Sequence, residues 1–173
     1  MSQEGQLKKR IFTKLGSMFP AVSKKLADGY QSVSVEEPIP WTEFVKPLSE
    51  CRVAMVTTAG IHHPSQQPFD LQDNDGDPTF RVLDGTTLFD DYVFSHDSYD
   101  HSDAEKDPNI VLPLDRLREF ESKNVIGELS TKHYSFMGHI TGRHLQELTE
   151  KSAVEVAEEL KNDQIDLVLL APA

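Results

Sequence analysis

A short run rich in histidine and aspartate is the part of the sequence best equipped for chemistry. Residues 95–103 read Ser-His-Asp-Ser-Tyr-Asp-His-Ser-Asp and supply four candidate side chains: His96, Asp97, His101 and Asp103. Imidazole titrates near neutrality, which suits acid–base catalysis or substrate binding. The same donors could instead bind a metal ion, with His63 or His144 as a further ligand. A third interpretation is a hydrogen-bonded loop, because Asp and Ser side chains commonly cap turns.

Two strongly apolar segments are expected to position these residues. Residues 52–58 are nearly continuous in apolar and β-branched side chains and run into Ala59-Gly60, and residues 165–171 have the same character. Strands without alternation are buried on both faces, as in a parallel sheet. We therefore expect the two strands to lie side by side or one strand apart.

The remaining elements complete an α/β pattern. Short strands are expected at 79–83 and 92–95, a helix at 113–122, a strand or turn at 124–129, an aromatic loop at 133–140, and a helix opening at the capping box Ser152-Ala-Val-Glu155. Apolar strands separated by helices imply right-handed crossovers. We expect a Rossmann-like three-layer parallel sheet with helices on both faces, incomplete at its C-terminal end.

In open sheets of this kind the working crevice lies at the carboxyl ends of the strands. His63 follows the first strand and His96 follows the segment 92–95, so both should reach this edge, and His133 and His139 flank the aromatic loop. We expect His63, His96, His101 and His139 to line one cavity. Cys51 precedes the first strand, roughly 23 Å from that edge, and is expected to be a buried small hydrophobe rather than a nucleophile.

Composition narrows the function classes. The 173 residues carry a net charge of −12, and residues 66–107 hold twelve acidic side chains against two basic ones. This balance argues against nucleic acid and anionic membranes as partners. Cys51 is the only cysteine, which excludes an internal disulfide and a thiolate metal cluster. No apolar run of about 18 residues and no signal-peptide core appear, so a cytoplasmic location is expected.

The chain is expected to divide into three parts. Residues 1–30 form an amphipathic basic helical arm, with the apolar stripe at 6–28; residues 31–50 form a Pro-rich linker; and residues 51–173 form the α/β domain. Neither a GxGxxG nor a Walker A motif is present. The run Asp73-Asn-Asp-Gly-Asp77 is acidic enough for calcium but fails the EF-hand register.

Several stretches, read in order, resemble one family. They are Pro47–Gly60, Gly76-Asp-Pro-Thr-Phe80, Ser95-His-Asp-Ser-Tyr-Asp-His-Ser-Asp-Ala104, Pro113-Leu-Asp-Arg-Leu117, His133-Tyr-Ser-Phe-Met-Gly-His-Ile140 and Asp166–Pro172. Over about residues 40–173 the chain is similar to the selenoprotein B family of glycine, sarcosine, betaine and D-proline reductases. The third and fifth stretches are the specific ones.

The resemblance implies reductive cleavage of a C–N bond in an amino acid or its N-methyl derivative, with a dithiol as reductant. It implies a selenocysteine or cysteine nucleophile, a pyruvoyl group on a partner subunit, and other reductase-complex subunits as partners; a homo-oligomer is compatible with it. Motif matching alone places six residues in the substrate pocket: His96, Asp97, His101, Asp103, His133 and His139. We expect catalytic roles for His96, Asp97, His101 and His139, and substrate binding for Asp103, His133 and His63, the last from its position after the first strand. No cofactor and no metal are expected in this chain itself.

The sequence departs from the family at the redox residue. In relatives that residue follows the last strand, in a run like Pro-x-(selenocysteine or cysteine)-Pro-x-x-Cys, whereas here the printed sequence ends at Leu170-Ala-Pro-Ala173. We therefore expect a shortened form of a reductase subunit. The alternatives are a catalytically silent binding or assembly protein that kept the fold and, more remotely, a metal-dependent enzyme using the His/Asp cluster.

Overall fold

The computed structural model describes residues 41–87, 91–96 and 99–173, together with the single residues Ile11, Phe19 and Lys24. The main sheet is built around β1 (Arg52–Thr57). On one side β1 pairs in parallel with β7 (Leu167–Ala171), and on the other with β5 (Glu128–Leu129) and then β6 (Lys132–Phe136). The outer strand β3 (Phe80–Asp84) runs antiparallel to β6.

The pairing of β1 with β7 confirms that the two apolar segments are neighbours. Val53 through Thr57 lie opposite Leu167 through Ala171 in an unbroken parallel register. β1 is buried along most of its length, but β7 is an outer strand of the described sheet and leaves Leu170 69% exposed. The α/β class is confirmed. The sheet is mixed rather than wholly parallel, because β3 joins it in the antiparallel sense.

The segment expected as a strand at 92–95 lies outside the main sheet. β2 (Ile61–His62) and β4 (Val93–Phe94) form a separate antiparallel pair. The strand expected within 92–95 is confirmed, but among the described residues it pairs only with β2 and does not join the sheet that contains β1. Its carboxyl end still reaches the edge of β1, because the Ser95 N–H donates to the Gly60 carbonyl at 2.8 Å.

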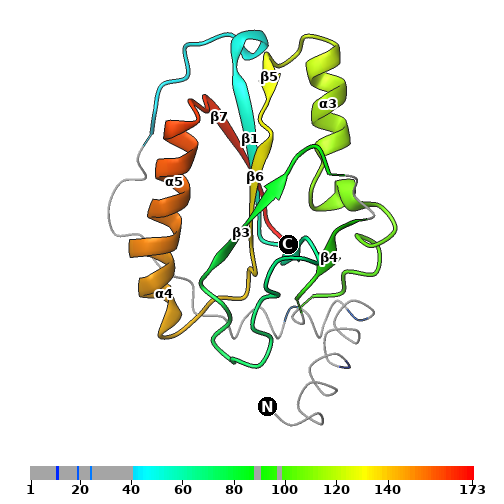
Figure 1. The fold of residues 1–173 in the computed structure, drawn as a ribbon, viewed down its shortest axis with the longest axis vertical. Helices are drawn as coiled ribbons and strands as arrows, with labels where there is room; N and C mark the ends of the chain where they lie inside the picture. Colours follow the sequence, from blue (N-terminus) through cyan, green and yellow to red (C-terminus); the bar gives the residue numbers. More distant parts are fainter. Residues whose placement is uncertain (1–10, 12–18, 20–23, 25–40, 88–90, 97–98) are drawn as a thin grey trace.

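Helices cover both faces of the sheet (Figure 1). One face packs a core of Met55, Leu83, Leu112 and Leu117 under α3 (Leu114–Ser122). The other packs Tyr134, Phe136 and Val156 under a continuous helix made of α4 (His144–Glu147), a π-helical turn (η4, Leu148–Ser152) and α5 (Ala153–Asn162). Short 3-10 turns occupy Leu48–Glu50 (η1) and Pro108–Ile110 (η3). Within the described residues, none of the helices has the length and apolarity needed to cross a membrane.

Two local predictions are wrong. Residues expected as an aromatic loop from 133 form strand β6, whose buried His133 and Ser135 interrupt the apolar signal of a core strand. Ser152 does not cap a helix: it has helical backbone angles, makes no capping hydrogen bond, and lies within the long helix. The expected arm at 1–30, most of the linker at 31–50, and Asp97 fall outside the described residues, apart from the three isolated positions and residues 41–50.

Candidate active site

The carboxyl end of β1 is the point where three strands of the sheet are tied together. The Thr58 N–H donates to the Ala171 carbonyl of β7 at 3.1 Å, and the Ala173 N–H donates to Thr58 Oγ1 at 2.9 Å. The Gly60 N–H donates to the Phe136 carbonyl of β6 at 2.9 Å. This edge is where the crevice of an open α/β sheet is expected.

His96 is held between two glycine turns at this edge. Gly60 and Gly138 have φ of +66° and +96°, a region that side chains rarely adopt. A Cβ on Gly60 would stand 2.6 Å from the Ser95 carbonyl oxygen and 3.1 Å from His96 Cβ. A Cβ on Gly138 would stand 2.4 Å from the Thr58 carbonyl oxygen and 3.1 Å from His96 Nε2. The missing side chains leave room for the imidazole beside the exits of β1 and β6.

Aromatic rings connect His96 to His101. The Tyr99 ring meets His96 edge-on at 4.5 Å and His101 at 5.7 Å, and Phe94 stacks on His101 at 5.4 Å. The Tyr99 hydroxyl donates to the Ala59 carbonyl at 3.2 Å. Burial and, secondarily, the nearby Glu105 raise the pKa of Tyr99, so the phenol stays protonated. These contacts make His96, Tyr99 and His101 one packed group.

His101 has a carboxylate partner. Its Nδ1 lies 2.8 Å from Glu105 Oε1, one helical turn further along the chain. Such a carboxylate orients the ring. The two imidazoles of the group therefore have different surroundings. His96 lies against the Tyr99 ring and the backbone of two glycine turns, whereas His101 lies beside the carboxylate of Glu105.

Of the expected site residues, His63 and Asp103 have partners on their own loops. His63 Nδ1 lies 2.7 Å from Ser65 Oγ, and Asp103 pairs with Lys106 at 2.8 Å on the exposed surface. His139 follows Gly138 in a turn that packs against the acidic run at residues 73–77. A Cβ on Gly76 would stand 1.8 Å from the His139 carbonyl oxygen. His96 and His101 thus share a contact with Tyr99, whereas His63 and Asp103 contact other residues.

His133, expected to bind substrate, lies in the sheet. It is fully buried in β6, and its Nδ1 accepts a hydrogen bond from the Met55 N–H at 3.1 Å. Burial, followed by the charge of Arg118, lowers its pKa to about 4. A neutral imidazole that replaces a backbone acceptor in the sheet is suited to a structural role.

Two residues that contact Ser95 or His96, namely His62 and Tyr99, were not among the expected site residues. His62 is buried, and its Nε2 lies 2.8 Å from Ser95 Oγ. The signal that could have found it is the His62-His63 pair next to a strand exit, because neighbouring strand residues face opposite sides and one of the two must turn inward.

The residues considered for metal binding are engaged in other contacts. His144 Nε2 lies 3.0 Å from Asp73 Oδ2, and Arg143 bonds to the same carboxylate. The hydrogen bond from His144, ahead of the other contacts, lowers the pKa of Asp73 to about 2. Among the residues that the structure describes, no three or more His, Cys, Asp or Glu side chains converge in a way that could hold a metal ion.

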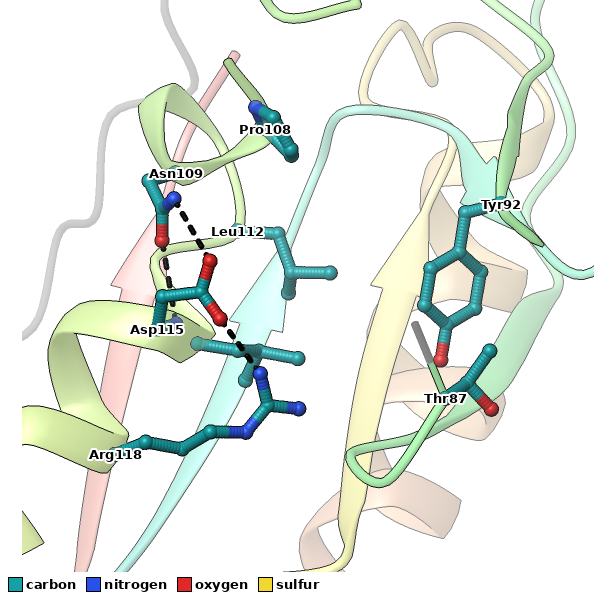
Figure 2. A pocket seen from close by; sticks show the side chains of 8 residues that line it. Thr87, Tyr92, Pro108, Asn109, Leu112, Asp115 and Arg118 are labelled. Atoms are coloured by element: carbon teal, nitrogen blue, oxygen red, sulfur yellow. Dashed lines mark hydrogen bonds and ion pairs between the residues drawn. The ribbon is translucent and has the colours of Figure 1, made fainter. Parts of the chain in front are cut away.

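A small pocket lies away from this edge, between α3 and the β3–β4 connection (Figure 2). Its polar wall is a network in which Arg118 Nη1 donates to Asp115 Oδ1 at 2.7 Å and Asn109 Nδ2 donates to Asp115 Oδ2 at 3.3 Å. Arg118 also donates to the Gly85 carbonyl. The guanidinium thereby joins α3 to the turn after β3, and none of the residues expected from the sequence lines this pocket.

Comparison with known proteins identifies the family. The sequence profile of glycine/sarcosine/betaine reductase selenoprotein B matches residues 24–173. The chain belongs to this family. The match begins earlier than the resemblance seen in the sequence, at residue 24 rather than about 40.

Curated relatives agree with the assignment to the selenoprotein B family. The D-proline reductase subunit gamma of Acetoanaerobium sticklandii is 35% identical over 138 residues, covering 80% of this chain and 55% of that protein. The sarcosine reductase complex component B subunit beta of Peptoclostridium acidaminophilum is 35% identical over 108 residues, covering 60% and 24%. The betaine reductase complex component B subunit beta of the same organism is 32% identical over 157 residues, covering 85% and 34%.

The chain thus spans about half the length of the first relative and about a quarter to a third of the other two. No solved structure matches.

For a member of the selenoprotein B family, the location of the only cysteine is informative. Cys51 is fully buried just before β1, and its thiol donates to the Pro47 carbonyl at 3.2 Å. This confirms the expectation of a buried small side chain at the amino edge, opposite the edge that holds His96. Cys51 is therefore poorly placed to act as a redox nucleophile.

Proposed function

We propose that this chain provides the carboxyl-edge site of a glycine-, sarcosine-, betaine- or D-proline-type reductase. The substrate is an amino acid or its N-methyl derivative, and a C–N bond is cleaved. Cleavage consumes two electrons and two protons, which a dithiol supplies as it becomes a disulfide. One proton ends on carbon and the other on the nitrogen whose bond to carbon is broken; this nitrogen leaves as an amine, except from D-proline, where the opened ring keeps it. The observation that carries the proposal is the family membership together with the packed group at the edge where β1, β6 and β7 end.

Within this proposal His96 carries the proton to the nitrogen of the broken bond. Its imidazole lies beside Gly138 and Thr58, and Thr58 is hydrogen-bonded to the end of β7. A positioned general acid typically contributes a factor of about 10² to 10⁴ in rate. His101, oriented by Glu105, is the second imidazole of the proposed catalytic set. Asp97 and His139 adjoin His96 in sequence or through the Gly138 turn and complete the proposed catalytic set.

His63 and Asp103 remain the proposed substrate-binding groups, whereas we assign His133 to the sheet. The nucleophile that the chemistry needs is a selenol or thiolate. Because Cys51 is buried at the opposite edge, we propose that the nucleophile comes from outside these 173 residues. The partners are the other subunits of the complex, including the one that carries the pyruvoyl group, and the assembly is cytoplasmic.

A second candidate is a catalytically silent assembly protein that keeps the fold. The observation favouring it is that the only thiol of the chain is buried just before β1, at the edge opposite the one that holds His96. The two candidates differ in whether the histidine group affects turnover or only assembly.

The test is to purify the tagged chain with its complex from the producing organism. Dithiol oxidation is measured with glycine, sarcosine, betaine and D-proline. The cleavage product measured beside it is the released amine for the first three and the ring-opened amino acid for D-proline, whose nitrogen stays attached to the product. One of the four should support both at a one-to-one ratio, and His96→Gln should lower that rate by about 10² or more. Lys151→Gln, on the exposed side of η4, is the matched control and should leave the rate unchanged. An assembled complex without turnover on any of the four would favour the silent protein.

A further inference from the structure

His62 and Ser95 form a buried contact between β2 and the loop that carries His96. Both side chains are less than a tenth exposed, and His62 Nε2 lies 2.8 Å from Ser95 Oγ. They are 33 residues apart in sequence. The backbone beneath them is paired too, with Ile61 opposite Phe94 and His62 opposite Val93. The contact is thus built into the β2–β4 pair.

The second ring nitrogen determines which tautomer His62 adopts. His62 Nδ1 lies 3.0 Å from the His63 carbonyl oxygen, and a carbonyl can only accept. Nδ1 therefore carries the proton, and in the neutral ring Nε2 is left as an acceptor. The Ser95 hydroxyl donates to it. The Phe69 ring, edge-on at 6.1 Å, holds the imidazole in this orientation from the side.

Ser95 is thereby fixed at three points. Its hydroxyl donates to His62, its N–H donates to the Gly60 carbonyl at 2.8 Å, and its own carbonyl lies against Gly60, where a Cβ would stand 2.6 Å away. His96 is the next residue. The direction in which its side chain leaves the backbone depends on the orientation of Ser95, and the space it enters is the gap between Gly60 and Gly138.

We propose that His62 is a positioning residue for His96, acting through the Ser95 hydroxyl. His62 does not reach the reacting atoms; it holds the loop so that the His96 imidazole stays between the two glycines and edge-on to Tyr99. The positioning itself depends only on this structure, and its consequence for turnover rests on the function proposed above. Displacing a reacting group by as little as about 1 Å can lower a rate by about 10²-fold.

The first test observes His96 directly. The Tyr99 ring centroid lies 4.5 Å from that of His96, so its ring current should shift the NMR signals of the imidazole protons. His62→Leu and Ser95→Ala should each move these signals by some tenths of a ppm toward their values in an unfolded peptide. His62→Gln, whose amide can donate to the His63 carbonyl and accept from Ser95, should restore them. Ser65→Ala removes an exposed Ser–His contact on the same loop and should leave them in place.

The second test measures turnover in the assembled complex. His62→Leu and Ser95→Ala should each lower kcat by about 10- to 100-fold with little change in KM, and the double variant should lose no more than either single one. Gln at position 62 should recover most of the rate. Unmoved His96 signals in both single variants, or losses that multiply in the double variant, would overturn the positioning role. If these variants displace the His96 signals but the wild-type complex reduces none of the four substrates, only the proposed function is refuted.

Discussion

The backbone N–H of Met55 in β1 donates a hydrogen bond to the side chain of His133 in β6, at 3.1 Å. The neighbouring strand cannot supply a carbonyl here. Val53 lies opposite Leu129, and Val56 lies opposite Tyr134. Three residues of β1 therefore span the same length as five residues of the neighbouring chain. The two extra residues form a bulge that interrupts the backbone hydrogen bonds between the two parallel strands. The His133 imidazole takes the place of the missing carbonyl and accepts the hydrogen bond from Met55.

Replacing His133 by Ala should therefore destabilise the fold strongly. The variant leaves a cavity in the core and an orphaned N–H on Met55, and each defect is expected to contribute about 1–3 kcal/mol. Denaturant unfolding should show a loss of about 2–5 kcal/mol. Tyr134→Phe, at the next position of the strand, loses only the hydrogen bond to Glu159 and serves as the control. A His133→Ala loss below about 1 kcal/mol would contradict the bridging role.

The low pKa of His133 makes stability depend on pH. Burial lowers this pKa from 6.5 to about 4 in the folded protein. The unfolded chain therefore binds the proton first, and stability should fall as pH drops from about 6.5 toward 4, by on the order of 3 kcal/mol, and then level off for this group. Urea unfolding across this range measures it. In His133→Gln the decline should be smaller by about this amount; an equal decline there would assign it to other groups.

Arg118 should tune that titration. Its positive charge is the second cause of the low pKa of His133, after burial, and its guanidinium bonds to Gly85, whose Cα faces the imidazole. Arg118→Gln should raise the pKa of His133 above its value of about 4, as measured by NMR titration of the imidazole. Arg116→Gln, on an exposed pair with Glu119, is the matched control and should leave the titration unchanged.

Gly138 should tolerate no side chain. Alanine there would combine an unfavourable φ of +96° with a Cβ 2.4 Å from the Thr58 carbonyl oxygen. We expect Gly138→Ala to lower the free energy of unfolding by about 2–4 kcal/mol and to displace His96. Gly142→Ala should have a smaller effect, since its φ is +53° and its nearest neighbour is the movable carboxylate of Asp75. Equal losses at the two positions would contradict this explanation.

Cys51 should react with thiol reagents only when the protein opens. Its side chain is fully buried and its thiol bonds to the Pro47 carbonyl. The rate of modification by a disulfide reagent should follow the opening of the core and rise with denaturant. Fast labelling under native conditions would show an accessible thiol and would weaken the proposal that the nucleophile comes from elsewhere.

The sequence alone determined the elements whose signal is apolar and local. The continuous runs at 52–58 and 165–171 predict parallel neighbours, and β1 pairs with β7 from Val53 to Thr57. Burial on both faces is confirmed for most of β1 but is wrong for β7, where Leu169 and Leu170 are exposed. The spacing of Leu114 and Leu117 predicts α3, and both are buried. The position of Cys51 before a core strand predicts its burial. In each case the hydrophobic effect acts on residues that are neighbours in the chain or in one strand.

Only the tertiary structure decided where the polar groups go. His133 lacks any local sign that it bridges β6 to a backbone N–H 78 residues away, and His62 none that its partner is Ser95. The room for His96 comes from two glycines on different strand exits. A buried polar group is placed by whichever distant donor or acceptor satisfies it, and that partner becomes known only when the strands have been brought into register.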